Sequence, residues 1–334
     1  MACTRPLGSG RRAGGDEVED AVSEVDALTT VELQAGRHRF ELRPYAPVLM
    51  GIVNTNPGSF SDEEHLSSLD AQLAHARRLV AAGAGIVDVG FDSGVTHGTP
   101  RPLDQQLADG LPLVERLVTE GILVSVDTPF HEVARASLEA GAAMVNDVSG
   151  LADVRIAEAC AEHGAALVVL HTRIGHRQER FPDYDDVVGD VEGFFRERIA
   201  LAGRHGLARE QIVLDPGYDY DKKPHHTVAT IQAYTRFAEL GLAFLSGVSR
   251  KYFTGIITGA RPPERLPETL ATVAAVRAFP GFLRVHDVDE VARFLAVTDV
   301  IEGLRPFPEY STDDPTLKWT GPAREANQAD AATR

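Results

Sequence analysis

The sequence is poor in cysteine and contains no long uninterrupted apolar segment. Among its 334 residues only Cys3 and Cys160 are cysteines, so a disulfide-stapled extracellular framework is excluded. No apolar run reaches the roughly 20 residues that a membrane-spanning helix requires. The Arg-containing start also lacks the apolar core of a signal peptide. We therefore expect a protein of the reducing cytoplasm that has no membrane partner.

Positive charge is scarce as well. The chain has 33 Lys and Arg residues against 49 Asp and Glu residues, which gives a formal net charge of −16. This balance argues against nucleic acid as a partner, although it leaves room for a local basic pocket. A Gly-rich loop ending in Gly-Lys-Ser/Thr, a His-Glu-x-x-His motif and a zinc-spaced Cys/His cluster are all absent from the sequence. Nucleotide triphosphatases and structural zinc modules are therefore disfavoured.

The sequence instead contains eight short apolar runs that each end in polar residues. In the clearest, Ile212–Leu214 is too short for a helix and predicts a buried strand, which stops at Asp215 before Pro216-Gly217 turns the chain. A carboxylate at the end of a buried strand is costly unless another group pairs with it. The eight runs end, in chain order, at Asn54, Asp92-Ser93, Asp127, Asn146-Asp147, His171, Asp215, Ser249–Lys251 and His286-Asp287.

Segments with helical periodicity separate these runs. The clearest covers Glu63 to Gly83, with Ser61 and Glu64 as a capping box at its start. Further helices are predicted over Leu103–Thr119, His131–Ala140, Val154–His163, Val187–His205, His225–Leu240, Pro267–Phe279 and Val288–Val300. Buried strands that alternate with helices predict a parallel sheet, and eight units favour closure into an α/β TIM (β/α)8 barrel over residues 47 to about 304. An open doubly wound sheet is the alternative.

The segments outside the barrel are expected to be smaller and partly mobile. Val31–Leu42 alternates in polarity around Ala35-Gly36 and predicts a short N-terminal β-hairpin that plugs the barrel floor. The predicted organisation is therefore a flexible segment over residues 1–28, a barrel with its hairpin over 29–310, and a C-terminal tail over 311–334.

The polar strand ends predict a binding site. In a TIM barrel the C-terminal ends of the strands meet at one mouth. Asp127, Asn146 and Asp215 would offer acceptors to the amino and ring N–H groups of a flat, nitrogen-rich heterocycle, and Lys251 could donate to a ring carbonyl or nitrogen. Asp127 alone would more often be a turn or cap residue. Because polar residues recur at the ends of the predicted barrel strands, we expect Asp127 to have a role at the site.

A second group of residues suits an anion. Arg284 and His286, with Asn54, would bind a phosphate or pyrophosphate at the same mouth. His171 also ends a strand, and two interpretations stay open for it: a buried structural histidine or a site residue.

These motifs, in this order, resemble those of the dihydropteroate synthase family, the pterin-binding TIM barrels of folate synthesis. The matching segments are Met50–Asn54 with Pro57 and Ser59–Asp62, Ser125–Thr128, Val145–Gly150, Asp215–Gly217 with Lys222, Ser249–Lys251 and Arg284–Asp287. Any one of them is a weak signal, but several in family order along nearly the whole barrel are a strong one.

The resemblance implies a reaction and a role for each matching residue. Dihydropterin pyrophosphate would lose pyrophosphate, and an arylamine such as p-aminobenzoate would attack the exposed carbon. The pterin ring would be held by Asp127, Asn146, Met144, Asp215 and Lys251. Asn54 would bind Mg²⁺, and Arg284 with His286 would bind pyrophosphate. A homodimer is implied in the same way. Asn54, Asp127, Lys251, Arg284 and His286 are the expected catalytic set.

The chain also departs from the family in the loops that close over the substrates. Asn56 and Gly58 replace a Thr and an Asp in the first loop, and Gly94 and Val95 replace a Thr and an Arg in the second. The loop after Asp215 has carboxylates at Asp219 and Asp221 where the family often has glycine. These changes favour a diverged paralogue with a different amine acceptor or weak p-aminobenzoate turnover. A pterin-binding protein without synthase activity and a pterin-dependent methyltransferase are the alternatives.

Overall fold

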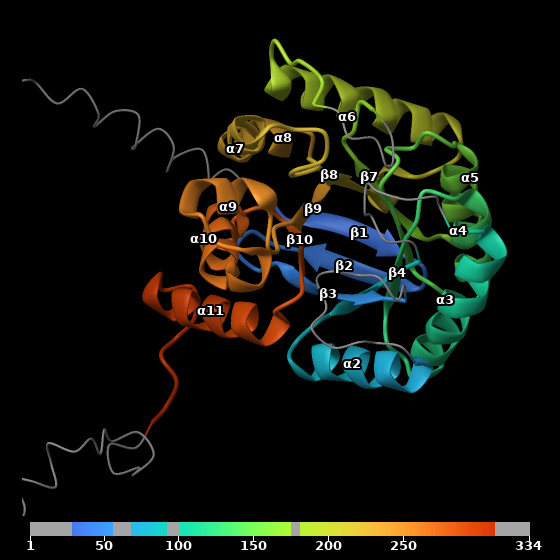
Figure 1. Ribbon diagram of the computed structural model, residues 1–334, viewed down its shortest axis with the longest axis horizontal. Coiled ribbons are helices and arrows are strands. Elements are labelled where there is room, and N and C mark those ends of the chain that lie inside the picture. Colours follow the sequence, from blue (N-terminus) through green and yellow to red (C-terminus); the bar gives the residue numbers. More distant parts are fainter. Residues whose placement is uncertain (1–28, 56–67, 92–100, 175–180, 311–334) are drawn as a thin grey trace, which may run out of the picture. The chain divides into compact units, whose positions relative to one another are not determined.

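The computed structural model describes residues 29–55, 68–91, 101–174 and 181–310. The chain consists of two compact units, residues 1–292 and 293–334. The first contains a two-stranded sheet and a closed eight-stranded barrel (Figure 1). In the described ranges, no helix has both the length and the apolar character needed to cross a membrane.

The barrel strands are all parallel and pair in the closed order β10-β3-β4-β5-β6-β7-β8-β9, which confirms the predicted TIM barrel. The strands are β3 Val48–Asn54, β4 Ile86–Gly90, β5 Val124–Asp127, β6 Met144–Asp147, β7 Ala166–Leu170, β8 Ile212–Asp215, β9 Ala243–Gly247 and β10 Gly281–Val285. The helices are α2 Leu69–Ala81, α3 Leu103–Thr119, α4 His131–Glu139, α5 Arg155–His163, α6 Val187–Arg204, α7 Pro224–Gln232, α8 Tyr234–Ala238, α9 Tyr252–Thr258, α10 Leu266–Val276 and α11 Val288–Ile301.

The helix predicted over His225–Leu240 is wrong in one respect, because the segment forms two helices. α7 ends at Gln232, and α8 begins at Tyr234. The hydroxyl of Thr230 bonds back to the carbonyls of His226 and Thr227, a pattern that bends helices. The ring of Tyr234 then turns into the core, where its hydroxyl lies 2.7 Å from Ser246 Oγ.

The helix predicted over Glu63 to Gly83 is not continuous through Ser68, and its predicted start at Glu63 lies outside the described residues. Ser68 is the N-cap of α2, and Ser68 Oγ accepts a hydrogen bond from the Ala71 N–H at 3.2 Å. The predicted capping box of Ser61 and Glu64 lies outside the described residues, as do the predicted closing loops at 56–60 and 92–98.

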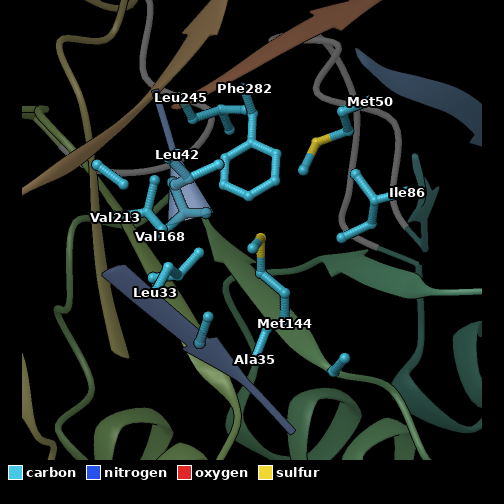
Figure 2. Packing of buried hydrophobic residues seen from close by; sticks show 13 residues of the cluster. Leu33, Ala35, Leu42, Met50, Ile86, Met144, Val168, Val213, Leu245 and Phe282 are labelled. Atoms are coloured by element: carbon cyan, nitrogen blue, oxygen red, sulfur yellow. The ribbon is translucent and has the colours of Figure 1, made fainter. Parts of the chain in front are cut away.

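The predicted hairpin is confirmed, and it fills one end of the barrel. β1 Val31–Ala35 pairs with β2 His38–Leu42 in antiparallel register. Figure 2 shows Leu33, Ala35 and Leu42 among inward-facing side chains of the barrel strands. Apolar burial of this kind stabilises by about 25 cal/mol per Å². The hairpin therefore gives this end of the barrel an apolar, packed interior.

Strand alternation places the polar side chains above that interior. Ile86, Met144 and Phe282 belong to the apolar core cluster. Because side chains two residues apart on a strand share a face, Asp88 follows Ile86 into the barrel, and Asn146 and Arg284 follow the other two. The barrel interior is thus apolar toward the hairpin and polar toward the C-terminal ends of the strands.

Candidate active site

Arg284 lies at the centre of the polar end of the barrel, between two carboxylates. Its Nε donates to Asp88 Oδ2 at 2.6 Å, and one terminal nitrogen donates to Asp127 Oδ2 at 2.8 Å. Burial opposes the charged form, yet Asp88 and Asp127 together raise the pKa of Arg284 above its ordinary value. The guanidinium is therefore always charged, and β4, β5 and β10 are joined through it.

Asp88 also contacts Asn146 and is the main site residue that the sequence interpretation missed. It is fully buried, and Asn146 Nδ2 donates to its Oδ2 at 3.3 Å. A single carboxylate inside the run Ile86–Gly90 was available as a signal. Polar residues that follow the strands do not indicate it, because Asp88 lies within β4 rather than after it.

Three buried acceptors at this depth have no partner among the described residues: Asp88 Oδ1, Ser125 Oγ and Asn146 Oδ1. All three residues lie on neighbouring strands, and Asp88 is in register with Ser125. An unsatisfied buried polar atom costs about 1–3 kcal/mol. A ligand that brings several N–H donors into the mouth would remove this cost.

Asp215 and Lys251 form another side of the site. We call the group of Asp88, Asp127, Asn146, Asp215, Lys251 and Arg284 the cup. Asp215 is buried and accepts the Gly217 N–H at 2.7 Å, and burial raises its pKa although Lys251 and Arg284 oppose the rise. Lys251 Nζ donates to the Tyr218 carbonyl at 2.8 Å, and burial lowers its pKa against the fields of Asp219 and Asp215. A lysine of this kind can approach a neutral ring closely.

His286 is neutral at physiological pH. Its Nδ1 lies 2.9 Å from Ser249 Oγ. Burial, together with the positive charges of Arg284 and Arg250, lowers the pKa of His286 to about 3. Arg250 is itself paired with Asp287 at 2.7 Å. Any contribution of His286 to anion binding must therefore come from a hydrogen bond rather than from a positive charge.

Asn54 ends β3 beside the backbone of Gly90. Its Oδ1 is so close that a Cβ built on Gly90 would lie 2.6 Å from it, so a larger residue at this position would displace the Asn54 amide. Thr55 donates to the Gly90 carbonyl through both its N–H, at 3.0 Å, and its Oγ1, at 3.0 Å. Asn54 is thus held at the mouth with its amide oxygen directed toward β4.

Met144 lies deeper in the barrel than the polar residues at the mouth. It is fully buried in the core cluster, two residues before Asn146 on the same strand. Its predicted contact with a pterin ring stays a prediction.

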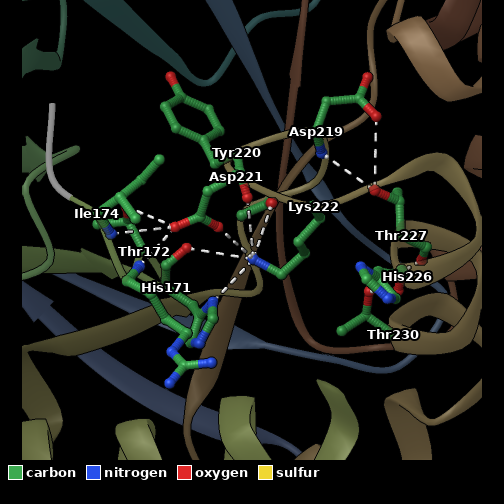
Figure 3. A network of polar contacts seen from close by, with 12 residues as sticks. His171, Thr172, Ile174, Asp219, Tyr220, Asp221, Lys222, His226, Thr227 and Thr230 are labelled. Atoms are coloured by element: carbon green, nitrogen blue, oxygen red, sulfur yellow. Dashed lines mark hydrogen bonds and ion pairs between the residues drawn. The ribbon is translucent and has the colours of Figure 1, made fainter. Parts of the chain in front are cut away.

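His171 is a buried structural histidine, which decides between the two interpretations left open. It is fully buried; its Nε2 lies 3.0 Å from Asp190 Oδ1, and its Nδ1 lies 2.7 Å from the Nζ of Lys222 (Figure 3). Because an ammonium can only donate, Nδ1 is the acceptor and Nε2 carries the proton. Burial, followed by the charge of Lys222, lowers the pKa of His171 to about 4.

Lys222 is a second ammonium near Asp215 and, unlike the partly buried Lys251, is fully buried. Besides His171 Nδ1, its Nζ donates to the carbonyls of His171 at 3.3 Å, Gly217 at 3.2 Å and Tyr220 at 3.3 Å. Burial lowers its pKa to about 8, against the field of Asp221. Lys222 belongs to one of the matching sequence motifs, but the motif alone indicated no role for it.

The structure brings six of the predicted residues together, namely Asp127, Asn146, Asp215, Lys251, Arg284 and His286, whereas Met144 lies deeper in the apolar core. The charges of Lys251 and Arg284 act on Asp215, and those of Asp127 and Arg284 act on Lys251, so these side chains lie close to one another. Asn146 joins them through Asp88. In the described ranges, no group of three or more His, Cys, Asp or Glu residues could by itself hold a metal ion.

Comparisons with known proteins agree with this arrangement. Residues 50–286 match the family described as pterin binding enzyme. A dihydropteroate synthase of Synechocystis is 36% identical over 259 residues, which cover 76% of this chain and 89% of that protein. The Xanthomonas albilineans dihydropteroate synthase with 4-aminobenzoic acid superposes with a TM-score of 0.74 at 34% identity, covering 84% of this chain and 100% of the other. The same enzyme in complex with 7,8-dihydropteroate gives a TM-score of 0.71 at 34% identity, covering 83% of this chain and 100% of the other.

Proposed function

Because the chain belongs to the dihydropteroate synthase family of pterin-binding enzymes, we propose that it condenses 6-hydroxymethyl-7,8-dihydropterin pyrophosphate with an arylamine. The bond from the exocyclic methylene carbon to the pyrophosphate oxygen breaks, a bond from that carbon to the amine nitrogen forms, and the amine loses a proton. The observation that carries this proposal is the group of buried acceptors and cations at the barrel mouth.

The pterin lies in the cup, with its hydrogen-bonding edge against the acceptors. Its amino and ring N–H groups donate to Asp215 and to Asp88 and Asn146, each of which has an otherwise unsatisfied oxygen. Lys251 donates to the ring from the opposite side. The ring is neutral and electron-rich, and it suits a site in which negative and positive groups nearly balance. The same ring supports positive charge on the exocyclic carbon as pyrophosphate leaves.

Pyrophosphate leaves from the side of Arg284 and Asn54. The guanidinium stabilises the negative charge that develops on the leaving oxygen, and the His286 imidazole supplies a hydrogen bond. Mg²⁺ takes oxygen ligands and usually keeps phosphate oxygens and waters beside a few protein oxygens. The amide oxygen of Asn54, which lies beside Gly90, is a ligand of this kind. Asn54 would hold the ion, which when bound would neutralise charge on the departing pyrophosphate.

The amine acceptor is p-aminobenzoate or a different arylamine. The first is supported by the related enzyme whose structure contains 4-aminobenzoic acid. The second is supported by Gly94 and Val95, which replace a Thr and an Arg that the family uses near the second substrate. We expect weak turnover of p-aminobenzoate for that reason. By family resemblance we also propose that the protein is a homodimer and that it works in the cytoplasm. Light scattering on the purified chain would test the oligomeric state.

The decisive experiment is a pyrophosphate-release assay on the full chain. Dihydropterin pyrophosphate is supplied with a panel of amines that includes p-aminobenzoate, with and without Mg²⁺. Release that depends on both an amine and Mg²⁺ supports the proposal, and the preferred amine identifies the acceptor. Rapid p-aminobenzoate turnover would contradict the expected divergence. If the chain binds the pterin but releases no pyrophosphate with any amine, it is a pterin-binding protein without synthase activity.

A further inference from the structure

The loop between β8 and α7 carries a carboxylate on each side of Tyr220. Asp219 and Asp221 both have backbone angles in the left-handed region, with φ of 64° and 45°. This conformation is unfavourable for residues other than glycine, although Asp and Asn tolerate it best. Glycine would avoid the cost at both positions, so the contacts of the two carboxylates have to offset it.

Asp221 joins this loop to the segment that follows β7. Its side chain is 1% exposed. Figure 3 shows its carboxylate directed at that segment, where Oδ2 accepts hydrogen bonds from Thr172 Oγ1 at 3.1 Å and from the N–H groups of Arg173 at 2.5 Å and Ile174 at 3.3 Å. Its Oδ1 accepts from the hydroxyl of Tyr184 at 3.1 Å. Four donors therefore converge on one buried carboxylate.

Lys222 completes this junction from below. Its Nζ lies 3.7 Å from Asp221 Oδ1 and contacts carbonyl oxygens on both sides of the junction, those of His171 and Tyr220. A buried carboxylate is stable only when it is paired and hydrogen-bonded, and here both conditions are met.

Asp219 joins the same loop to the segment that follows β9. Its carboxylate accepts hydrogen bonds from the backbone N–H groups of Tyr252 and Phe253 at the start of α9. It also receives the hydroxyl of Thr227 at 3.4 Å. Lys251 immediately precedes these two amides, so Asp219 restrains the residue that carries the site's ammonium group.

Tyr220 lies between the two junctions, next to Lys251. The Lys251 ammonium lies 5.4 Å from the centre of the Tyr220 ring. In Figure 3 this ring projects away from the contacts of Asp221 and Lys222. We propose that Asp219 and Asp221 are positioning residues that hold Tyr220 and Lys251 as one rigid wall of the site, against which the arylamine part of the second substrate packs. This inference rests on the proposed function, because the second substrate is defined there.

The test compares the binding of two ligands to the full chain by calorimetry. 6-Hydroxymethyl-7,8-dihydropterin occupies the cup alone, whereas 7,8-dihydropteroate carries an added aminobenzoyl group that reaches the wall. We expect the wild-type chain to bind dihydropteroate more tightly. Asp221→Gly should weaken the binding of dihydropteroate about tenfold or more, as the loss of a charged hydrogen-bond acceptor implies. The affinity for the pterin alone should change little. Asp219→Gly should lower the affinity for both ligands because Lys251 is then less restrained.

Two further variants separate positioning from simple stability. Asp221→Asn keeps an oxygen acceptor and tolerates the left-handed backbone, so it should retain most of the preference for dihydropteroate and serves also if the glycine variant does not fold. Asp183→Asn removes a carboxylate that is 97% exposed, and it should change neither affinity. A melting temperature that falls in Asp221→Gly while the ratio of the two affinities stays at the wild-type value would overturn the inference. A wild-type chain that binds both ligands equally would overturn it too. Binding of neither ligand would refute the proposed function itself.

Discussion

Asp88 shows how one buried side chain can orient the charge of another. Its carboxylate receives both Arg284 Nε and Asn146 Nδ2, so it fixes a cation and an amide of the site at once. A charge-assisted hydrogen bond of this kind contributes about 1.5–3 kcal/mol. Arg284 would otherwise be free to turn toward Asp127 alone.

Asp88→Asn is therefore expected to weaken pterin binding about tenfold or more, since the amide loses the charged acceptor for Arg284. Calorimetric titration with 6-hydroxymethyl-7,8-dihydropterin measures the effect. Glu120→Gln is the matched control, because Glu120 also binds an arginine, Arg77, but on the surface. Exposed pairs contribute little, so this control should bind as the wild type does. Equal affinities for all three proteins would show that Asp88 does not organise the site.

Lys251→Ala is expected to abolish measurable pterin binding, because it removes the ammonium beside Asp215 and leaves buried acceptors without a donor. The same titration checks this. Lys223→Ala provides the control, since Lys223 lies in the same loop region but is paired with the exposed Asp183. Unchanged binding by the Lys251 variant would count against the assignment of the cup.

At the scale of elements, the hairpin packs one end of the barrel, and the strand ends form the binding site at the other. β1 and β2 supply apolar side chains to one end, and polar residues of β4, β5, β6, β8 and β10 line the other. Stability and binding should therefore respond to different substitutions.

Leu33→Ala is expected to lower the free energy of unfolding by about 2–5 kcal/mol, the usual cost of a cavity left by a buried leucine. Leu33 is 2% exposed in the core cluster. Leu304→Ala makes the same chemical change at a residue that is 51% exposed and should cost far less. Urea denaturation measures both, and calorimetry should show pterin affinity unchanged in Leu33→Ala. A small loss of stability in that variant would mean that the hairpin is not part of the folded core.

At the scale of the whole molecule, buried histidines make stability depend on pH. His171 binds a proton near pH 6.5 in the unfolded chain, but in the folded chain its pKa is about 4. Between these values the unfolded state binds more protons, so the stability present above pH 6.5 is lost as pH falls. For one such histidine the loss is at most about 1.4 kcal/mol per pH unit.

His171→Gln should reduce this slope between pH 6.5 and 4, although the variant is less stable at pH 7 because contacts to Lys222 and Asp190 are weakened. Urea denaturation at a series of pH values measures the slope. An identical slope in His171→Gln would mean that this imidazole titrates normally in the folded state.

Local patterns predicted most elements correctly, and their failures have physical causes. The eight apolar runs became the eight barrel strands because each is short, aliphatic and bounded by turn residues. The break after Gln232 was missed because it follows from the Tyr234 ring turning into the core. Periodicity along the chain contains no information about such a contact.

The sequence by itself determined the barrel, the hairpin and the family, because strand length, alternation and motif order are all local properties of the chain. Tertiary structure alone decided that Asp88 binds Arg284, 196 positions away, and that His171 is neutral beside a buried ammonium. Which charge meets which, and how far burial moves a pKa, depends on neighbours that only barrel closure brings together.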